Sequence, residues 1–536
     1  MKRLMTKLFA LLLVLTMVLP GMSVSADQEV ILNYSGKTVI IATNDVHGNI
    51  EGYSYVKGLR TYLESAGAEV ITVDVGDFSQ GTPYVSENKG KNAITLMNLA
   101  GYDIVTLGNH EFDYGWKQLK SNLKKAKFKV LCADVFNSKG KTIYEASTVW
   151  TTEDGLKIGF FGLETPEAMT KSNPKNVKGL KFLRGEELYK AAQNEIDKLK
   201  ESSDIVICLA HLGLDADDEP NRSTDIYNYT EGIDLMFDGH SHSVMTEGPD
   251  GEFIQSTGTK FENIGIVVID NKTKTIEDRY NLSMDFIKEN IKPDRTVSKK
   301  AKKIIKNIDA KFGQVFAKSE VDLNGEKIPN RSQETNLSDL ICDAMEWQVL
   351  SESELLVDRD HVVTINNGGC VRASLGAGDI TMNDIKTVLP FGNTLTVVYV
   401  KGSQLLEALE ASTYLTPEAL GGFPQVAGIK YTINTAKKFR QGEQYADSTY
   451  YAPKKCVRVT IQEINGQPFN KKDTYAVITN IFCSDGGDTY YVFGQCETKF
   501  DTGMPQDEAV VNYIENVLGG VIGEDYAQPQ GRITVK

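Results

Sequence analysis

Short apolar runs that alternate with helix-like stretches constrain the fold of this chain more than any other feature. The runs lie at 38–42, 70–75, 104–107, 158–163, 205–209, 235–237 and 264–269. Runs of this length, separated by helical stretches, are typical of the strands in a layered α/β domain. The alternation ends near residue 285, so we expect the first domain to occupy residues 27–285.

Polar clusters follow these apolar runs and contain five of the six histidines of the chain. The clusters are Asp45-Val46-His47, Asp77, Gly108-Asn109-His110-Glu111, His211 and Gly239-His240-Ser241-His242. Histidines beside carboxylates and amides at strand ends are typical of active sites in α/β folds, because the chain leaves the sheet there. We therefore predict that the clusters converge on a metal site.

Seven residues are the candidate metal ligands: Asp45, His47, Asp77, Asn109, His211, His240 and His242. Residues two apart in an extended chain point to one side, which pairs Asp45 with His47 and His240 with His242. If Asp77 bridges two metals, each metal receives four ligands: Asp45, His47, Asp77 and His242 for one, and Asp77, Asn109, His211 and His240 for the other. Nitrogen and oxygen donors permit two divalent ions of Zn, Mn, Co, Fe or Mg.

His110 and Asp113 remain once the ligands are assigned. They lie three residues apart, so their side chains touch if this turn is helical. The carboxylate would then hold the imidazole in one tautomer and keep it protonated, as a catalytic acid requires. We predict a catalytic dyad of His110 and Asp113, with Glu111 and Phe112 serving the structure.

The first 26 residues have the features of an export signal. Lys2, Arg3 and Lys7 precede an apolar segment at 8–19, and Val24-Ser25-Ala26 has the small residues of a cleavage site. No second hydrophobic run follows, so we expect a secreted protein with no membrane anchor after cleavage.

Charge and cysteine content exclude several classes of function. The net charge is −14 for the whole chain and −17 once the three basic residues of the signal are removed. Lysine and arginine do not cluster beside aromatic residues, which disfavours a nucleic-acid polymer as partner. The seven cysteines show no Cys-x-x-Cys spacing, which disfavours a zinc finger, and a pairing of Cys483 with Cys496 stays open.

The second half of the chain has its own organisation. An amphipathic pattern at 297–312 predicts a connecting helix, and we assign residues 286–312 to the linker. Apolar runs at 362–365, 395–400, 457–461 and 475–479 then predict a second α/β domain over residues 313–536. A cleft between two such domains is a common place for a ligand.

The ordered clusters Asp45-x-His47, Gly76-Asp77, Gly108-Asn109-His110-Glu111-Phe112-Asp113, His211 and Gly239-His240-Ser241-His242 resemble those of calcineurin-like metallophosphoesterases. With its second half included, the chain resembles exported 5′-nucleotidases of the UshA and ecto-5′-nucleotidase type. The resemblance implies an N-terminal four-layer α/β/β/α sandwich with two metals and a C-terminal α/β nucleotide-binding domain. It also implies in-line attack on phosphorus by a metal-bridging hydroxide, with His110 acting on the transferred phosphoryl group or the leaving oxygen.

The resemblance also implies substrate-binding residues in the second half. In the loop Asn366-Asn367-Gly368-Gly369-Cys370-Val371-Arg372, Asn367 would contact the base and Arg372 the phosphate. The remaining matches are Arg331 for the phosphate, Phe391 and Phe482 for an aromatic clamp on the base, and Asp488 for the ribose hydroxyls. Cys370 departs from the family pattern because it replaces a third glycine.

These observations predict a secreted dimetal phosphohydrolase that releases phosphate from nucleoside 5′-monophosphates, with di- and triphosphates left open. One alternative is a 2′,3′-cyclic nucleotide 2′-phosphodiesterase with 3′-nucleotidase activity, and another is a nucleotide-sugar hydrolase. A non-catalytic nucleotide-binding protein is the alternative outside enzymes. Retention of His110 and Asp113 argues against that last class, because neither residue is needed to hold a metal.

Overall fold

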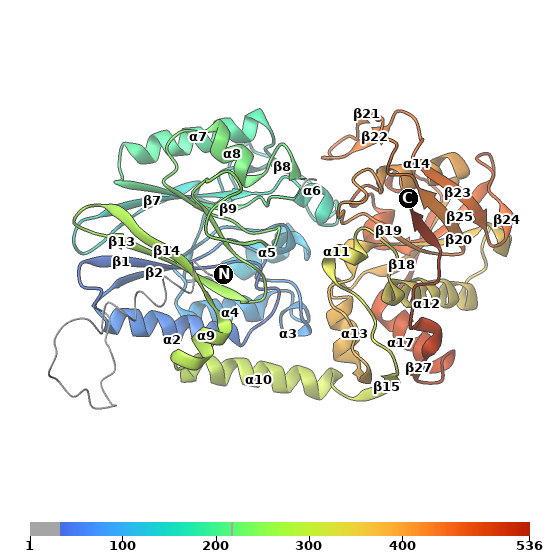
Figure 1. Ribbon diagram of the computed structural model, residues 1–536, viewed down its shortest axis with the longest axis horizontal. Coiled ribbons are helices and arrows are strands. Elements are labelled where there is room, and N and C mark those ends of the chain that lie inside the picture. Colours follow the sequence, from blue (N-terminus) through green and yellow to red (C-terminus); the bar gives the residue numbers. More distant parts are fainter. Residues whose placement is uncertain (1–32, 216–217) are drawn as a thin grey trace.

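The computed structural model describes residues 33–215 and 218–536, so the export signal expected at 1–26 lies outside the described residues. The chain forms two α/β domains joined by the long helix α10 (Arg295–Phe312), which runs along one side of the first domain and ends beside the second (Figure 1). The predicted two-domain α/β architecture is confirmed. Within the described ranges, no helix combines the length and apolar character needed to cross a membrane.

Two six-stranded sheets form the centre of the N-terminal domain. The first has the order β14 (Thr275–Ser283), β13 (Asn263–Asp270), β1 (Lys37–Thr43), β2 (Glu69–Asp74), β3 (Ile104–Val105) and β4 (Lys129–Val130). The second has the order β11 (Val244–Met245), β12 (Ile254–Thr257), β10 (Leu235–Phe237), β9 (Ile205–His211), β7 (Lys157–Glu164) and β6 (Ser147–Thr151). Buried side chains of both sheets, including Ile40, Val73, Phe160 and Leu209, pack together between them.

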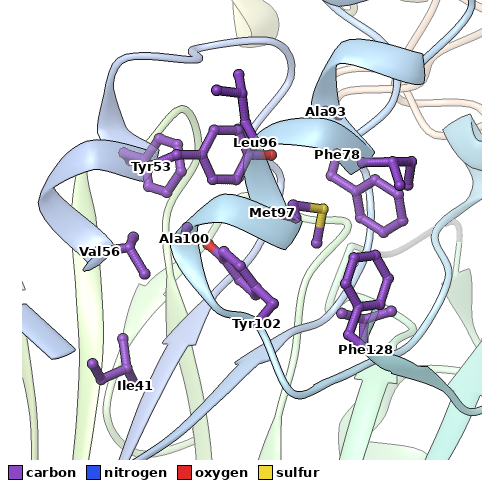
Figure 2. Close-up of a cluster of buried hydrophobic side chains, with 14 of the residues drawn as sticks. Ile41, Tyr53, Val56, Phe78, Ala93, Leu96, Met97, Ala100, Tyr102 and Phe128 are labelled. Atoms are coloured by element: carbon purple, nitrogen blue, oxygen red, sulfur yellow. The ribbon is translucent and has the colours of Figure 1, made fainter. Parts of the chain in front are cut away.

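Helices cover the outer face of each sheet and complete the predicted four layers. Helices α2 (Gly52–Ser65) and α4 (Lys91–Ala100) pack on the first sheet, where Tyr53, Met97 and Tyr102 belong to one buried cluster (Figure 2). Helices α7 (Glu186–Lys200) and α8 (Ser223–Tyr229) pack on the second. An apolar stripe at helical spacing is what allows each helix to bury one side against a sheet.

Parallel pairing determines where the polar clusters meet. Strands β1, β2 and β3 pair in parallel, and so do β7, β9 and β10. The carboxyl ends of parallel neighbours lie at the same edge of a sheet, and the loops that leave this edge carry the candidate ligands. His211 differs slightly from expectation, because it is the last residue of β9 rather than a residue beyond the strand.

The C-terminal domain is built around a five-stranded sheet. Its order is β19 (Pro424–Ala427), β16 (Val362–Asn367), β25 (Thr474–Asn480), β18 (Thr394–Lys401) and β26 (Lys499–Pro505). Alternate residues of β18 enter different cores: Leu395 and Val397 pack with α12 (Asn336–Glu352) and α17 (Gln506–Asn516), whereas Val398 and Val400 pack with α14 (Gly402–Ala411). This period of two is the signature of a strand buried on both faces.

Smaller sheets complete this domain. One has the order β17 (Gly378–Thr381), β15 (Val315–Ser319) and β27 (Val521–Ile522), and another has the order β24 (Gln467–Pro468), β23 (Val459–Ile464), β20 (Ile429–Ile433) and β28 (Ile533–Val535). A hairpin of β21 (Gln441–Gln444) and β22 (Tyr451–Pro453) projects beside them. Cys483 and Cys496, whose pairing the sequence left open, carry free thiols.

The N-cap residue Asp294 fixes the start of helix α10. The Asp294 side chain accepts hydrogen bonds from the backbone N–H groups of Thr296 and Val297, which fixes the first turn. Val297, Ala301 and Ile304 are buried on the N-terminal domain. The linker assigned to residues 286–312 is not one helix, because its first residues belong to a separate helix, α9 (Met284–Asn290). The domain boundaries at 285 and 312 stay predictions.

Candidate active site

The loops that carry the candidate ligands are left-handed at the ligand positions, not extended. The φ angles are +49° at Asp45, +42° at His47, +60° at Asp77, +72° at His240 and +60° at His242. The expectation of an extended backbone at Asp45–His47 and His240–His242 is therefore wrong, although Asp45 and His47 still face a common point. The side chains converge because tight turns redirect the backbone, and such strained positions are common at functional sites.

Two glycines allow these loops to approach one another. A Cβ atom on Gly108 would lie 2.3 Å from Asp77 Oδ1 and 2.8 Å from His211 Cε1. A Cβ atom on Gly239 would lie 2.8 Å from both Asp45 Oδ2 and His211 Nδ1. Glycine is required at both positions because the candidate ligands fill the space that any side chain would occupy.

One half of the site joins three loops. His47 Nε2 lies 3.1 Å from His242 Nε2 and 3.8 Å from Asp45 Oδ1, and His242 Nε2 lies 3.4 Å from Asp45 Oδ1. Asp77 adjoins this group, with Oδ2 3.6 Å from His47 Nε2. Two imidazole nitrogens and a carboxylate thus face a common point from two loops, which is the donor set a divalent ion binds.

The other half lies on the far side of Asp77. Its Oδ2 atom is 3.3 Å from His211 Nε2, while His211 Nδ1 lies 2.6 Å from the carbonyl oxygen of Val75. Asn109 Oδ1 lies 2.8 Å from His240 Nδ1. Asp77 therefore lies between the two groups of candidate ligands, in the position that a bridging carboxylate would take.

Burial of the imidazoles, and the pKa of two of them, fit metal ions, whereas at His211 and His240 burial is outweighed by the neighbouring carboxylates, which raise the pKa. His211 Nε2 is buried without a hydrogen-bond partner, which costs free energy unless a cation takes its lone pair. Burial, followed by the charge of Arg372 at His47 and of Lys327 at His242, lowers the pKa of both imidazoles well below the ordinary value. Neutral imidazole is the form that binds metal.

His110 and Asp113 form the contact that their spacing predicted. A short 3₁₀ turn at Asn109–Phe112 brings His110 Nδ1 to 2.7 Å from Asp113 Oδ2. The other carboxylate oxygen, Oδ1, accepts a hydrogen bond of 3.0 Å from Ser172 Oγ. The hydroxyl therefore holds the carboxylate that in turn orients the imidazole.

Glu111 joins the loop of Asp77 to its own loop through hydrogen bonds to their backbones. Its carboxylate accepts hydrogen bonds from the Ser79 hydroxyl and from the backbone N–H groups of Asp77, Phe78, Ser79 and Gly108. Burial, with the charge of Asp77 second, raises its pKa to about 7. The structural role expected for Glu111 is thus to hold the loop of Asp77 against Gly108.

Replacement of Glu111 by alanine should lower the free energy of unfolding by about 3–5 kcal/mol, because four buried N–H groups would lose their acceptor. Chemical denaturation followed by circular dichroism measures this. Glu289→Ala on the exposed face of α9 is the matched control, with an expected change below about 0.5 kcal/mol. Equal stability of the two variants would contradict the role of Glu111.

The second domain brings the two candidate phosphate-binding arginines to the same place. Arg372 Nη2 lies 3.3 Å from His47 Nε2, and Arg331 lines the same cavity. Burial, with the charge of Arg331 second, lowers the pKa of Arg372 to about 10, so the guanidinium stays charged at neutral pH. Two cations beside the candidate ligands suit a phosphate group.

The other candidate substrate residues also line this cavity. Asn367 Nδ2 donates to Asp488 Oδ2 at 2.8 Å, so the two polar residues are held together. The ring of Phe391 stacks on His110 with 5.5 Å between centroids, and Phe482 lies on the cavity wall. Cys370 is buried there, and its thiol donates to Gln506 Oε1 at 3.2 Å. The cavity volume is about 250 Å³.

Several residues of the site were missed by the sequence analysis. Lys327 donates to the carbonyl oxygen of Ser241 at 2.9 Å and pairs with Asp215 at 3.3 Å. Glu167 and Asp218 form a third buried group with His240. A signal existed for Glu167, because it follows the apolar run at 158–163 just as the ligand clusters follow theirs.

Comparisons with known proteins agree with this geometry. Residues 38–244 match the model of the calcineurin-like phosphoesterases, and residues 315–495 match that of the 5′-nucleotidase C-terminal domain. The trifunctional nucleotide phosphoesterase protein YfkN of Bacillus subtilis (strain 168) is 28% identical over 89% of this chain, which spans only 34% of that protein. The snake venom 5′-nucleotidase of Gloydius brevicauda is 27% identical over 93% of this chain and 89% of its own.

A solved structure shares the fold over both domains. The crystal structure of a 5′-nucleotidase precursor from Thermus thermophilus superposes with a TM-score of 0.77 and 26% identity, covering 93% of this chain and 99% of that one. The two family models follow one another along the chain and match the two domains described above. The chain is a metal-dependent phosphoric ester hydrolase of the 5′-nucleotidase family, with a calcineurin-like metallophosphoesterase domain and a 5′-nucleotidase C-terminal domain.

Proposed function

We propose that this protein releases phosphate from nucleoside 5′-monophosphates at a centre of two divalent metal ions. The observation that carries the proposal is the contact of Arg372 with His47, because it brings the half-buried candidate phosphate-binding side chain of one domain to the candidate metal ligands of the other. The relative from Gloydius brevicauda, a 5′-nucleotidase by name, supports the substrate class. We also propose that the protein is exported, on the evidence of its first 26 residues.

The residues that would hold the ions are Asp45, His47, Asp77, Asn109, His211, His240 and His242. When bound, the two ions would supply Lewis acidity toward the phosphate and lower the pKa of water. The charge of two divalent ions, together with Arg331 and Arg372, would attract an anionic substrate to a protein whose net charge is −14.

The chain's own side chains supply the other parts of the reaction. Arg331 and Arg372 bind the phosphate oxygens and orient the phosphorus. His110, held by Asp113, stabilises the charge on the transferred phosphoryl group or gives a proton to the leaving 5′-oxygen. Phe391 and Phe482 hold the base, and Asp488 accepts hydrogen bonds from the ribose.

A substrate panel tests the proposal. Phosphate release is measured with Mn²⁺, Zn²⁺, Co²⁺ or Mg²⁺ on AMP, 3′-AMP, 2′,3′-cyclic AMP, ATP and UDP-glucose. We expect kcat/KM to be highest for AMP. A preference for 3′-AMP or 2′,3′-cyclic AMP would contradict the proposal in favour of a phosphodiesterase. Release from none of them would favour a binding protein.

A further inference from the structure

Glu167 is a fully buried carboxylate at the edge of the candidate metal site. It precedes the short helix α6 (Ala168–Lys171), in the segment that leaves strand β7. Its Oε2 atom lies 3.1 Å from His240 Nε2, and Asp218 Oδ1 lies 3.5 Å from the same nitrogen. None of the roles proposed above involves this carboxylate.

The two nitrogens of His240 have different surroundings. Nδ1 faces Asn109 Oδ1 at 2.8 Å, among the candidate ligands, whereas Nε2 faces the two carboxylates. A carboxylate is an acceptor, so the hydrogen of a neutral imidazole belongs on Nε2, and Nδ1 then presents its lone pair. A carboxylate behind a histidine fixes both the tautomer and the orientation of a metal ligand.

We propose that Glu167 is a positioning residue for the metal site formed by Asp77, Asn109, His211 and His240. Glu167 accepts the Nε2 hydrogen of His240 and so directs Nδ1 of His240 to the ion. The inference rests on the proposed two-metal function and deepens it, because it assigns a further residue to the same site. Lys171, one helical turn along, places its ammonium 3.6 Å from Glu167 Oε2. The positive charge of Lys171 stabilises the buried carboxylate of Glu167, so a third metal ion is not needed for that purpose.

The other oxygen of Glu167 points to the second domain. The Tyr450 hydroxyl, itself buried, donates to Glu167 Oε1 over 3.5 Å. The backbone N–H of Asp488 donates to the carbonyl oxygen of Thr170 at 2.8 Å, and Arg184 donates to the carbonyl oxygen of Ser448. Helix α6 indeed lies where the first domain faces the second (Figure 1). Docking of the second domain therefore supports the residue that orients His240.

Metal titration of the full chain tests Glu167 without reference to turnover. The metal-free protein is titrated with Mn²⁺ by calorimetry and by electron paramagnetic resonance. We expect two ions per parent chain, and a roughly 10–100-fold weaker affinity of one site in Glu167→Gln with the other site unchanged. Tyr450→Phe should weaken the same site by about 2–10-fold. Glu186→Gln on the exposed face of α7 is the matched control and should bind like the parent.

Unchanged affinity of both sites in Glu167→Gln would overturn the inference. So would a third ion that binds the parent and is lost in the variant, because Glu167 would then be a ligand. If Glu167→Gln fails to fold, Glu167→Asp, whose carboxylate is about one bond shorter, should show the same selective loss at one site, and parental affinity there would overturn the inference. Two intact metal sites without any AMP hydrolysis would instead refute the proposed function alone.

Discussion

Replacement of Asp77 by asparagine should lower kcat/KM for phosphate release from AMP by at least about 10³-fold, which corresponds to about 4 kcal/mol of transition-state stabilisation. Its Oδ2 atom lies 3.3 Å from His211 Nε2 and 3.6 Å from His47 Nε2, between both groups of candidate ligands. The amide keeps the size of the side chain and an oxygen for the backbone N–H of His110, but it removes the negative charge that the two proposed metal ions would share. Steady-state kinetics and metal analysis by mass spectrometry measure both effects.

Asp278→Asn is the matched control for Asp77, because it makes the same change on an exposed strand residue. It should retain the parental rate and metal content. An Asp77→Asn variant that keeps two ions per chain and a rate within tenfold of the parent would show that Asp77 does not bridge them.

Replacement of His110 by alanine should lower kcat for AMP by about 10²-fold or more, while both metal ions stay bound. The reason is that the His110 ring hydrogen-bonds to Asp113 and stacks on Phe391, whereas its contact with the proposed ligand His47 is an edge-to-face ring contact at 5.4 Å between centroids rather than a hydrogen bond. Asp113→Asn should have a smaller effect in the same direction, because the imidazole stays in place but loses its carboxylate. Single-turnover kinetics separates this chemical step from product release.

His361→Ala is the matched control for His110. His361 is the histidine outside the site; it stacks on Tyr475 and pairs with Asp360 in the second domain. Its replacement should leave kcat within about twofold of the parent. A His110→Ala variant with the same kcat as His361→Ala would remove the dyad from the mechanism.

Much of the first domain was predictable because its strands are buried on both faces. Such strands appear in the sequence as uninterrupted apolar runs, and β1, β7, β9 and β13 each contain the run that predicted them. Strand β3 is shorter than its run, 104–107, because the chain turns toward Asn109 after Val105. Strand β23 starts at Val459, two residues after the run at 457–461 begins, and the backbone N–H groups of Val457 and Arg458 before it bind the Glu410 carboxylate.

The membership of the candidate site was easier to predict than its geometry. Asp and His residues that follow apolar runs can be recognised in the sequence. The left-handed turns that orient their side chains depend on contacts with distant loops. His240, for instance, is held by backbone and side-chain contacts to Asp45 and Asn109, which lie more than a hundred residues away. Local periodicity carries no information about such contacts.

The contacts between domains could not be predicted either, because they join residues that are far apart in the sequence. Tyr450 reaches Glu167 from a hairpin loop 283 residues later in the chain, and although Glu167 follows an apolar run, nothing in the sequence points to Tyr450 as its partner. A buried tyrosine and an isolated glutamate have many structural uses. Their pairing is evident only once both domains are placed together.

The most direct test of the two-metal assignment is a titration of the metal-free protein with Mn²⁺, in which bound metal and phosphate release from AMP are followed in the same samples. Release should rise steeply as the second ion binds and reach its maximum at two ions per chain. Parental turnover by the metal-free protein would contradict the assignment, and full loading with two ions without any turnover would contradict the proposed function.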